Sequence, residues 1–285
     1  MLLTIEQQHG ASVPLKIATI TLAGVVTLCI ALSARAAPEA DLWSIWDRQG
    51  SEVGIDHSLW QSVLGAHVVA GADGINLVDY DALRGDRSSL DQYIAYLASI
   101  DPRSYTRDEQ MAYWVNFYNA LTIQLVLAYP NKKSILRMGE GFFSIGPWDD
   151  VVTTVAGEPV TLNDIEHRIL RPIWQDHRIH YAVNCASLGC PNLSQEAYQP
   201  STLVRQLAAA EKAYLAHPRG VSIKKRTVTL STIFKWYRSD FGVTEADVLE
   251  YVAQHHAALA QLRKDNERLK VRYDYDWALN AADSD

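Results

Sequence analysis

The longest helical pattern in the chain, residues 107–129, constrains the fold most strongly. Its sequence, RDEQMAYWVNFYNALTIQLVLAY, repeats apolar residues three and four positions apart until Pro130 ends it. A helix with so broad an apolar face must be covered by other elements, so we expect it to lie in the core of a domain. The predicted face consists of Met111, Trp114, Val115, Tyr118, Leu121, Thr122, Leu125, Val126 and Tyr129.

An asparagine, Asn119, lies on this apolar face between Val115 and Thr122. A buried amide needs hydrogen-bond partners for its donor and acceptor groups. Two interpretations are open. Either Asn119 binds the backbone of a neighbouring loop, or it orients a catalytic group.

The rest of the sequence alternates helical patterns with short β-prone runs. The predicted helices cover residues 41–50, 88–100, 161–174, 201–216, 232–241 and 245–269, and the predicted hairpins cover 151–162 and 220–231. We therefore expect a helix-rich α+β fold with small antiparallel sheets or hairpins. No Pro-, Ser- or Gly-rich linker interrupts the later patterns, so a single globular domain is expected over residues 40–280.

The helix predicted at residues 161–174 has acidic residues near its start. Thr161 or Asn163 can cap it, with Asp164 or Glu166 three residues further on. Carboxylates in a first turn also suit the helix dipole. We therefore interpret Asp164 and Glu166 as capping residues first and as chemical groups second.

The first 36 residues have the pattern of a secretory signal peptide. Lys16 precedes the apolar run IATITLAGVVTLCIALS, and the small residues ARA end at Ala36. We expect a periplasmic or secreted protein after cleavage near Ala36, with no stable membrane span afterwards. The alternative is a retained anchor, because an apolar run of about 17 residues is at the lower limit for spanning a bilayer.

Charge and motifs argue against several classes of function. The chain has 26 Lys and Arg against 33 Asp and Glu, a net charge of −7, and its basic cluster at Lys224–Arg226 is short. Such a chain lacks the basic surface that binds nucleic acid. It also lacks a P-loop, a Rossmann glycine motif and an H-E-x-x-H motif, so no cofactor is expected. The expected partner is an unidentified small-molecule or peptide-like ligand.

The segment HYAVNCASLGCP, residues 180–191, contains the two cysteines that follow the leader. Alternating residues predict a strand over 178–185, and a turn rich in Ser, Gly and Pro follows it. A thiol at such a junction can be exposed, and free backbone N–H groups there lower its pKa. Cys185 is therefore the candidate nucleophile of an acyl-transfer or hydrolytic site.

A nucleophilic thiol needs a base, and the sequence offers several histidines. His180 is the nearest, but a five-residue offset on a regular strand places it on the opposite face from Cys185. A bend in the chain would be needed to bring the two side chains together. His167 and His177 are the competing bases, because folding can place them beside the thiol.

The remaining roles of such a site also have candidates. Asn119 would orient the imidazole, and backbone N–H groups near Ala186 and Ser187 would stabilise an oxyanion. These assignments predict a thiol-dependent hydrolase or acyltransferase that acts on an amide or peptide-like substrate in the cell envelope.

Two alternatives use the same residues differently. In an exported protein, Cys185 and Cys190 can form a structural or redox-active disulfide. The protein would then be a non-catalytic periplasmic binding or assembly module. The further alternative is a soft-metal site formed by His180, Cys185 and Cys190, although this spacing is unusual for zinc and a fourth ligand is missing.

Five segments of the sequence together resemble one family. They are AYWVNFYNALT (112–122), VTLNDIEHRILR (160–171), RIHYAVNCASLGCPNL (178–193), STIFKWYRSDF (231–241) and YDWALN (275–280). This ordered set is similar to the motifs of the family catalogued as domain of unknown function 547, most densely over residues 105–242. The resemblance implies relatives in bacteria, often exported, and in plants behind a coiled-coil segment. It implies no particular reaction, so the chemistry must come from the residues.

Overall fold

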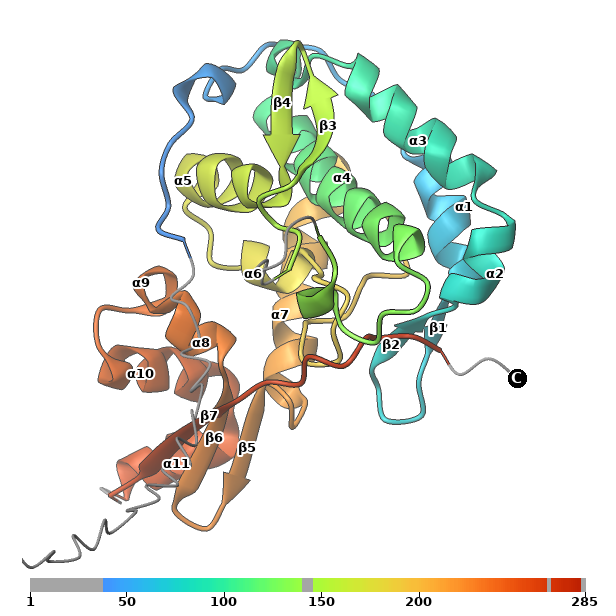
Figure 1. The fold of residues 1–285 in the computed structure, drawn as a ribbon. Coiled ribbons are helices and arrows are strands. Elements are labelled where there is room, and N and C mark those ends of the chain that lie inside the picture. Colours follow the sequence, from blue (N-terminus) through green and yellow to red (C-terminus); the bar gives the residue numbers. More distant parts are fainter. Residues whose placement is uncertain (1–37, 140–145, 266–267, 283–285) are drawn as a thin grey trace, which may run out of the picture. The chain divides into compact units, whose positions relative to one another are not determined.

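Helix α4 (Arg107–Ala128) runs through the middle of the packed elements (Figure 1). The computed structural model describes residues 38–139, 146–265 and 268–282. Every residue from Glu109 to Ile123 is buried, so the helix is enclosed on all sides over this stretch. The predicted helix is confirmed. The expected single apolar face was too narrow, because α3 (Ser88–Ser99) and the π-helix Asp164–Leu170 both pack against α4.

The other helices mostly follow the sequence patterns. Helix α3 buries the four residues whose spacing predicted it, Leu90, Tyr93, Ile94 and Leu97. Of the helix predicted at 41–50, only the 3-10 turn Ser44–Trp46 forms. The remaining helices are α1 (Ser58–His67), α2 (Tyr80–Gly85), α5 (Arg171–Trp174), α6 (Ile179–Ala182), α7 (Leu203–Ala216), α8 (Ile233–Trp236), α9 (Arg238–Phe241), α10 (Glu245–His255) and α11 (Ala257–Lys264).

The strands form small sheets at the edge of the helical part (Figure 1). Both predicted hairpins are confirmed, and the α+β class with them. The strands are β1 (Val68–Ala70) with β2 (Asn76–Val78), β3 (Val151–Val155) with β4 (Glu158–Thr161), and β5 (Val221–Lys224) with β6 (Thr227–Ser231) and β7 (Lys270–Asp274). Strand β7 pairs with β6 in parallel, which the expectation of antiparallel sheets did not include.

The predicted capping box at residues 161–164 is present. Thr161 Oγ1 accepts a hydrogen bond from the Asp164 backbone N–H at 3.0 Å, and Asp164 Oδ2 accepts one from the Thr161 N–H at 3.0 Å. These bonds use N–H groups that a helix start otherwise leaves unpaired. Glu166 does not take part in this cap. It is buried and pairs with a histidine, as described below.

The strand predicted over residues 178–185 is wrong. Residues 179–182 form the single helical turn α6, and the backbone becomes extended only at Val183. All four residues of α6 are buried, so no amphipathic pattern marks the turn in the sequence. Ile179 and Ala182 belong to the hydrophobic core around α4, whereas Tyr181 belongs to a second core below it. Helix α6 therefore lies between two cores and is held from both sides.

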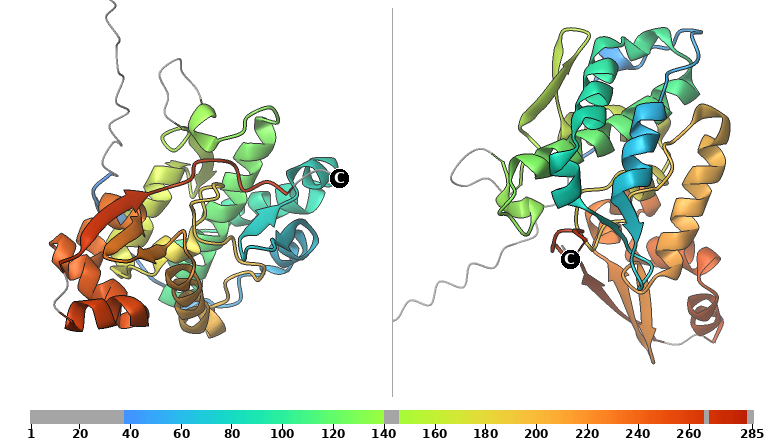
Figure 2. Two further views of the ribbon diagram at one scale, coloured as in Figure 1. Left: turned by 90° about the horizontal axis from the view of Figure 1, so that it is seen from below. Right: turned by 90° about the vertical axis from the view of Figure 1, so that its right-hand side faces the viewer.

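After β7 the C-terminal tail crosses the cysteine loop, residues 185–190 (Figures 1 and 2). Backbone N–H groups of Leu188 and Gly189 donate to the carbonyls of Ala278 and Asp276, both at 2.8 Å. A Cβ at Gly189 would lie 2.8 Å from the Asp276 nitrogen, so this crossing requires glycine. The tail then pairs with β2, where the Val78 N–H donates to the Asn280 carbonyl.

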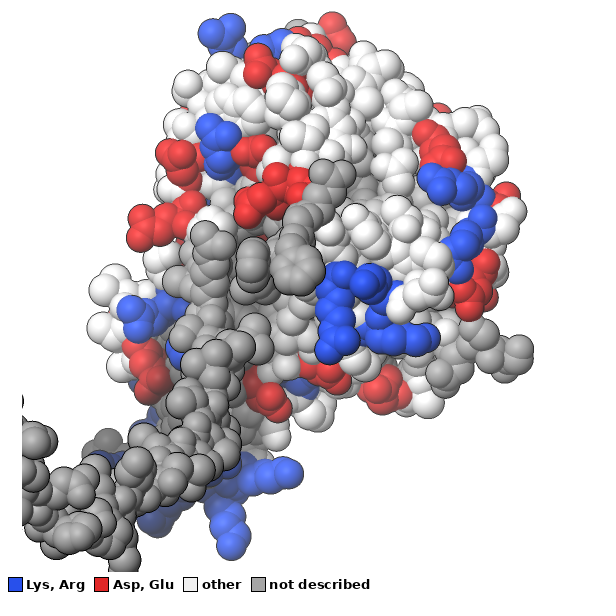
Figure 3. Space-filling view, in the orientation of Figure 1, with Lys and Arg blue, Asp and Glu red and all other residues white. Residues whose placement is uncertain are grey.

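The described surface carries charges of both signs (Figure 3). A group of Lys and Arg side chains lies on the face drawn, and exposed Lys132, Lys133 and Arg137 follow α4 in the chain. Within the described residues, no helix has the length and apolar character needed to cross a membrane. The predicted signal peptide, residues 1–36, lies outside the described residues.

Candidate functional site

Two cysteines, a serine and a tyrosine form one connected group, which we call the thiol cluster (Cys185, Ser187, Cys190 and Tyr275). The hydroxyl of Tyr275 lies 3.1 Å from Cys185 Sγ and donates to Cys190 Sγ at 3.2 Å. The Cys185 backbone N–H also donates to Cys190 Sγ, at 3.0 Å. Both cysteines are free thiols; Cys185 is half-buried and Cys190 is buried.

Ser187 completes this cluster. Its Oγ lies 3.3 Å from Cys185 Sγ and 2.9 Å from the Tyr275 hydroxyl. The Cys190 N–H donates to the Ser187 carbonyl at 3.1 Å, which closes the turn between the two cysteines. The sulfurs are therefore surrounded by neutral hydrogen-bonding groups from the loop and from the tail.

The loop is held in place by the amide of Asn119 on α4. Its Nδ2 donates to the Ala182 carbonyl at 2.9 Å, and its Oδ1 accepts from the Asn184 N–H at 2.8 Å. The structure therefore places Asn119 against the backbone, as in the first of the two interpretations, and not against an imidazole. Its contribution is to fix the chain immediately before Cys185.

A second amide, Asn184, closes the loop itself. Its Nδ2 donates to the Pro191 carbonyl at 2.7 Å, and its Oδ1 accepts from the Ala186 N–H at 2.8 Å. Ala186 adopts a left-handed φ of 59°, which is costly for a residue with a side chain. The Ala186 N–H is thus already used, so the predicted oxyanion donor at this position is not free.

The two thiols share their ionisation. Burial alone would raise the pKa of Cys190, but hydrogen bonds from Cys185, Tyr275 and Ser187 lower it to about 7. The hydrogen bond with Cys190 and burial raise the pKa of Cys185 well above its usual value. Negative charge on the pair is therefore more stable on Cys190, where the donors converge, than on Cys185.

Next to the thiol cluster lies a charge cluster (Glu166, His167, Arg171, His180 and Asp240). Arg171 binds Asp240 through two hydrogen bonds of 2.6 and 3.0 Å. His180 Nε2 lies 2.7 Å from Asp240 Oδ2, and its Nδ1 lies 3.5 Å from Glu166 Oε1. The charges of Arg171 and protonated His180 thus balance those of two carboxylates.

The pKa shifts in this cluster follow from burial and pairing. Burial alone would raise the pKa of Glu166, but the neighbouring His167, His180 and Arg171 lower it to about 2. Burial opposes the charge of His180, yet hydrogen bonds to Asp240 and Glu166 raise its pKa. Burial lowers the pKa of His167 to about 4, so this ring is neutral at pH 7.

The predicted bases all have partners other than the thiol. His180 lies between two carboxylates, and His167 Nδ1 lies 3.1 Å from Arg171. His177 pairs with Glu211 in a separate pocket. Among the described residues, no group of three or more His, Cys, Asp and Glu side chains could hold a metal ion, so the proposed set of His180, Cys185 and Cys190 is not assembled.

Comparison with known proteins identifies the region that supplies most residues of both clusters. Residues 102–215 match the family described as "Protein of unknown function, DUF547". This segment is therefore assigned to the DUF547 family. No curated protein and no solved structure matches the chain. The matched DUF547 segment carries both cysteines, Glu166 and His180, whereas Asp240 and Tyr275 lie beyond it.

Tyr237 lies against the charge cluster and within electrostatic range of Cys185. Its ring stacks on His180 with a centroid separation of 4.1 Å. Burial raises the pKa of Tyr237 well above its usual value, and negative charge on Glu166 and Cys185 adds to the rise. One neutral phenol thus separates the balanced charges from the ionisable sulfurs.

Sequence reasoning missed Tyr275, Asp240 and the pairing role of Glu166. Tyr275 follows Cys185 by 90 positions, and Asp240 follows His180 by 60. No periodic pattern links residues at such separations. The usable signal was the order of the family-like motifs, because each motif supplies at least one residue of these clusters or of their backbone supports.

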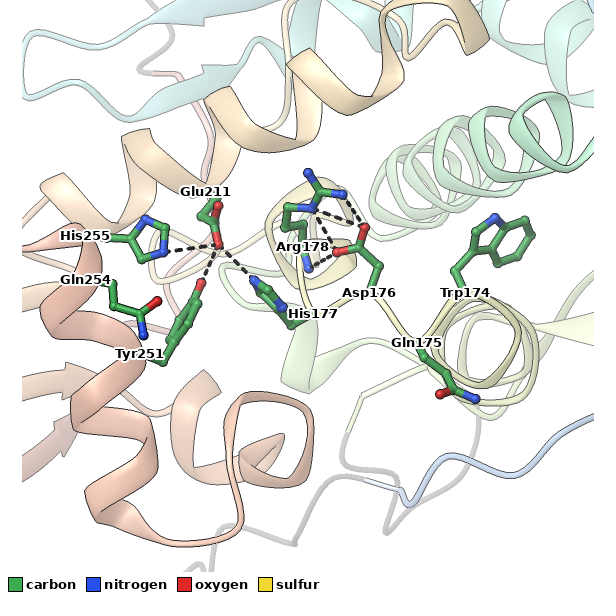
Figure 4. A pocket seen from close by; sticks show the side chains of 9 residues that line it. All are labelled: Trp174, Gln175, Asp176, His177, Arg178, Glu211, Tyr251, Gln254 and His255. Atoms are coloured by element: carbon green, nitrogen blue, oxygen red, sulfur yellow. Dashed lines mark hydrogen bonds and ion pairs between the residues drawn. The ribbon is translucent and has the colours of Figure 1, made fainter.

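The described residues also form a polar pocket away from the thiols (Figure 4). It has a volume of about 510 Å³ and lies beside α7 and α10. Glu211 Oε1 accepts from the Tyr251 hydroxyl at 2.6 Å and lies 2.9 Å from His177 Nε2. His255 Nε2 lies 3.9 Å from the same oxygen. This arrangement assigns His177 to Glu211 rather than to Cys185.

Proposed function

We propose that the protein is an exported thiol–disulfide exchange protein, with Cys185 and Cys190 as its redox-active pair. The observation that supports this function is that the two thiols are free, in contact, and joined through one hydroxyl, that of Tyr275. A second sulfur beside a half-buried thiol suits exchange by two thiols. One thiol attacks the partner's disulfide, and the other resolves the mixed disulfide that forms.

The exposure of the two thiols assigns their roles. Half-buried Cys185 is the sulfur that a partner's disulfide can reach, and buried Cys190 is the resolving thiol. The thiolate of Cys190 takes the proton of Cys185. The Cys185 thiolate then attacks one sulfur of the partner's disulfide, forms a mixed disulfide and releases the partner's other sulfur as a thiolate.

The second step transfers the electrons. Cys190 loses its proton and its thiolate attacks the Cys185 sulfur, forming the Cys185–Cys190 bond and releasing the partner's remaining thiolate. Because Cys190 begins as a thiolate, the two cysteines release one proton in all. The two partner thiolates take up this proton and a second one from water. The partner is thereby reduced by two electrons, and the protein is oxidised by two. A thiol donor restores the starting state by the reverse sequence.

Acyl transfer at Cys185 is the second candidate. The observation that favours it is the neighbouring Cys190, whose pKa of about 7 lets it accept the Cys185 proton in place of histidine. The substrate would be an amide or peptide-like group of the cell envelope. This function predicts a covalent acyl adduct on Cys185, whereas exchange predicts a mixed disulfide.

Export is part of the proposal because thiol exchange on disulfides belongs to an oxidising compartment. The apolar run and the ARA sequence ending at Ala36 support it. Mass spectrometry of the protein from the periplasmic or culture fraction should find a new amino terminus near Ala37. An intact Met1 in a membrane fraction would argue for a retained anchor.

A third cysteine, Cys29, lies in the predicted signal peptide. The test of exchange therefore uses the full chain carrying Cys29→Ser, so that Cys185 and Cys190 are the cysteines that remain. Reduced protein treated with oxidised glutathione should lose both thiols and gain the Cys185–Cys190 bond. Cys190→Ser should stop at a glutathione adduct on Cys185, and Cys185→Ser should react slowly. The matched control carries both Cys185→Ser and Cys190→Ser. Equal adducts on both cysteines, with no internal bond, would refute the function.

A further inference from the structure

The hydroxyl of Tyr275 lies within hydrogen-bond distance of three side chains of the cysteine loop. It lies 3.1 Å from Cys185 Sγ, 3.2 Å from Cys190 Sγ and 2.9 Å from Ser187 Oγ. Tyr275 immediately follows β7, so the C-terminal tail brings it to a loop 90 positions earlier in the chain.

The ring of Tyr275 is held by two tryptophans. Its centroid lies 4.8 Å from that of Trp236 and 4.6 Å from that of Trp277. The following residue, Asp276, accepts the Gly189 N–H at 2.8 Å, which ties the tail backbone to the loop. The position of the hydroxyl is therefore fixed by tilted contacts with these two rings and by a backbone hydrogen bond rather than by the sulfurs.

Protonation makes this hydroxyl a donor at neutral pH. Burial and negative charge on Cys185 and Cys190 raise the pKa of Tyr275 well above its usual value. A phenol has a single proton to donate, and an anionic sulfur is a stronger acceptor than a neutral thiol. The hydroxyl can therefore turn its proton toward whichever sulfur carries the charge.

We infer that Tyr275 is a catalytic residue of the thiol pair, whose hydroxyl donates to the anionic sulfur during exchange. This inference rests on the proposed function. In the reduced protein the hydrogen bond keeps Cys190 ionised. In the reverse direction, a donor thiolate attacks the Cys185 sulfur, the S–S bond breaks, and Cys190 departs as a thiolate. That leaving group receives the N–H of Cys185 and the O–H of Tyr275.

The chain supplies a matched pair of variants on one segment. Tyr275→Phe removes the hydroxyl and keeps the ring between its tryptophans. Tyr273→Phe removes a hydroxyl two residues earlier, which donates to Glu245 at 3.0 Å. The two changes remove the same atom from neighbouring positions, but only the first touches sulfur.

The measurement is the pH profile of iodoacetamide alkylation of the full chain carrying Cys29→Ser, together with its oxidation by oxidised glutathione. Tyr275→Phe removes one hydrogen-bond donor to the thiolate. The pH at which alkylation reaches half its maximum rate should therefore rise by about 1–2 pH units. Its oxidation at neutral pH should slow by about 10-fold or more. Tyr273→Phe should match the wild type in both measurements.

The outcomes separate this role from the proposed function. A wild-type chain that forms no Cys185–Cys190 bond overturns the function and the role with it. A wild type that forms the bond, with an unchanged midpoint in Tyr275→Phe, overturns the role alone. If Tyr275→Phe does not fold, p-aminophenylalanine at position 275 keeps a weaker donor on the same ring. Its midpoint should shift upward by less than 1–2 pH units, and an unshifted midpoint also overturns the role.

Discussion

The thiol cluster and the charge cluster both draw on residues 166–190 and on later parts of the chain, but they are organised differently. In the charge cluster, Arg171 and His180 are bound to carboxylates, so opposite charges balance. In the thiol cluster, neutral donors surround two sulfurs that share one negative charge. A balanced set of buried charges resists change, whereas a shared proton leaves one sulfur able to react.

This difference assigns stability to one cluster and chemistry to the other. The charge cluster connects α5, α6 and α9 through side chains, and thereby fixes the turn that leads to Cys185. The thiol cluster depends on that turn and on the tail. Substitutions in the first should therefore lower the free energy of unfolding, and substitutions in the second should alter thiol reactivity.

The largest expected effect is that of Arg171→Ala. The side chain of Arg171 is 4% exposed, and its removal leaves Asp240 without its bidentate partner. Breaking a buried pair of this kind should lower the free energy of unfolding by about 3–5 kcal/mol, measured in urea. The control is Arg87→Ala, whose pair with Asp91 is 43% exposed on both sides and should cost about 1 kcal/mol or less. Equal losses would contradict the distinction.

A smaller loss is expected where the tail crosses the thiol loop. In Gly189→Ala the new Cβ would meet the Asp276 backbone at 2.8 Å, which should cost about 1–3 kcal/mol of unfolding free energy. The control is Gly65→Ala in α1, where a Cβ meets nothing within 4 Å. That change should stabilise the protein by about 0.5–1 kcal/mol, because alanine favours a helix. Thermal unfolding of both variants checks this pair.

Acid should weaken the charge cluster through His167. Burial lowers the pKa of His167 to about 4, from an ordinary value of 6.5. The unfolded chain therefore binds more protons between these values, and the stability that His167 contributes is complete above pH 6.5 and is lost as pH falls toward 4. At about pH 5.5 the loss should be about 1 kcal/mol. Measured by urea unfolding, the free energy of unfolding of His167→Gln should fall less between pH 6.5 and 5.5 than that of the wild type. If both proteins lose the same free energy over this range, His167 is not the source of the loss.

The sequence predicted the elements whose pattern is local. Helices α3 and α4 and both hairpins follow from residues spaced a few positions apart, which is the range over which backbone hydrogen bonds act. Helix α6 was not predicted from the sequence, because it has four residues, all buried, between two cores. The parallel pairing of β7 with β6 was not predicted, because it joins segments separated by four helices, α8 to α11.

The candidate site was predicted only in part. Cys185 and Cys190 stood out because they lie in one short segment, and their contact follows from that closeness. The partners of His180 and of the sulfurs come from other motifs, so residue spacing could not assign them. His180 illustrates this limit: it was the nearest histidine to Cys185 in sequence, yet its Nε2 pairs with Asp240 and its Nδ1 lies 3.5 Å from Glu166.

The most direct test of the central claim is a redox titration of the full chain carrying Cys29→Ser in mixtures of reduced and oxidised glutathione. Peptide mapping at each mixture reports the Cys185–Cys190 bond. Thiol–disulfide exchange at Cys185 and Cys190 predicts one reversible two-electron transition, with the same midpoint whether the titration starts from thiols or from disulfide. Cysteines that stay reduced at every mixture, or that carry glutathione without joining each other, would contradict it.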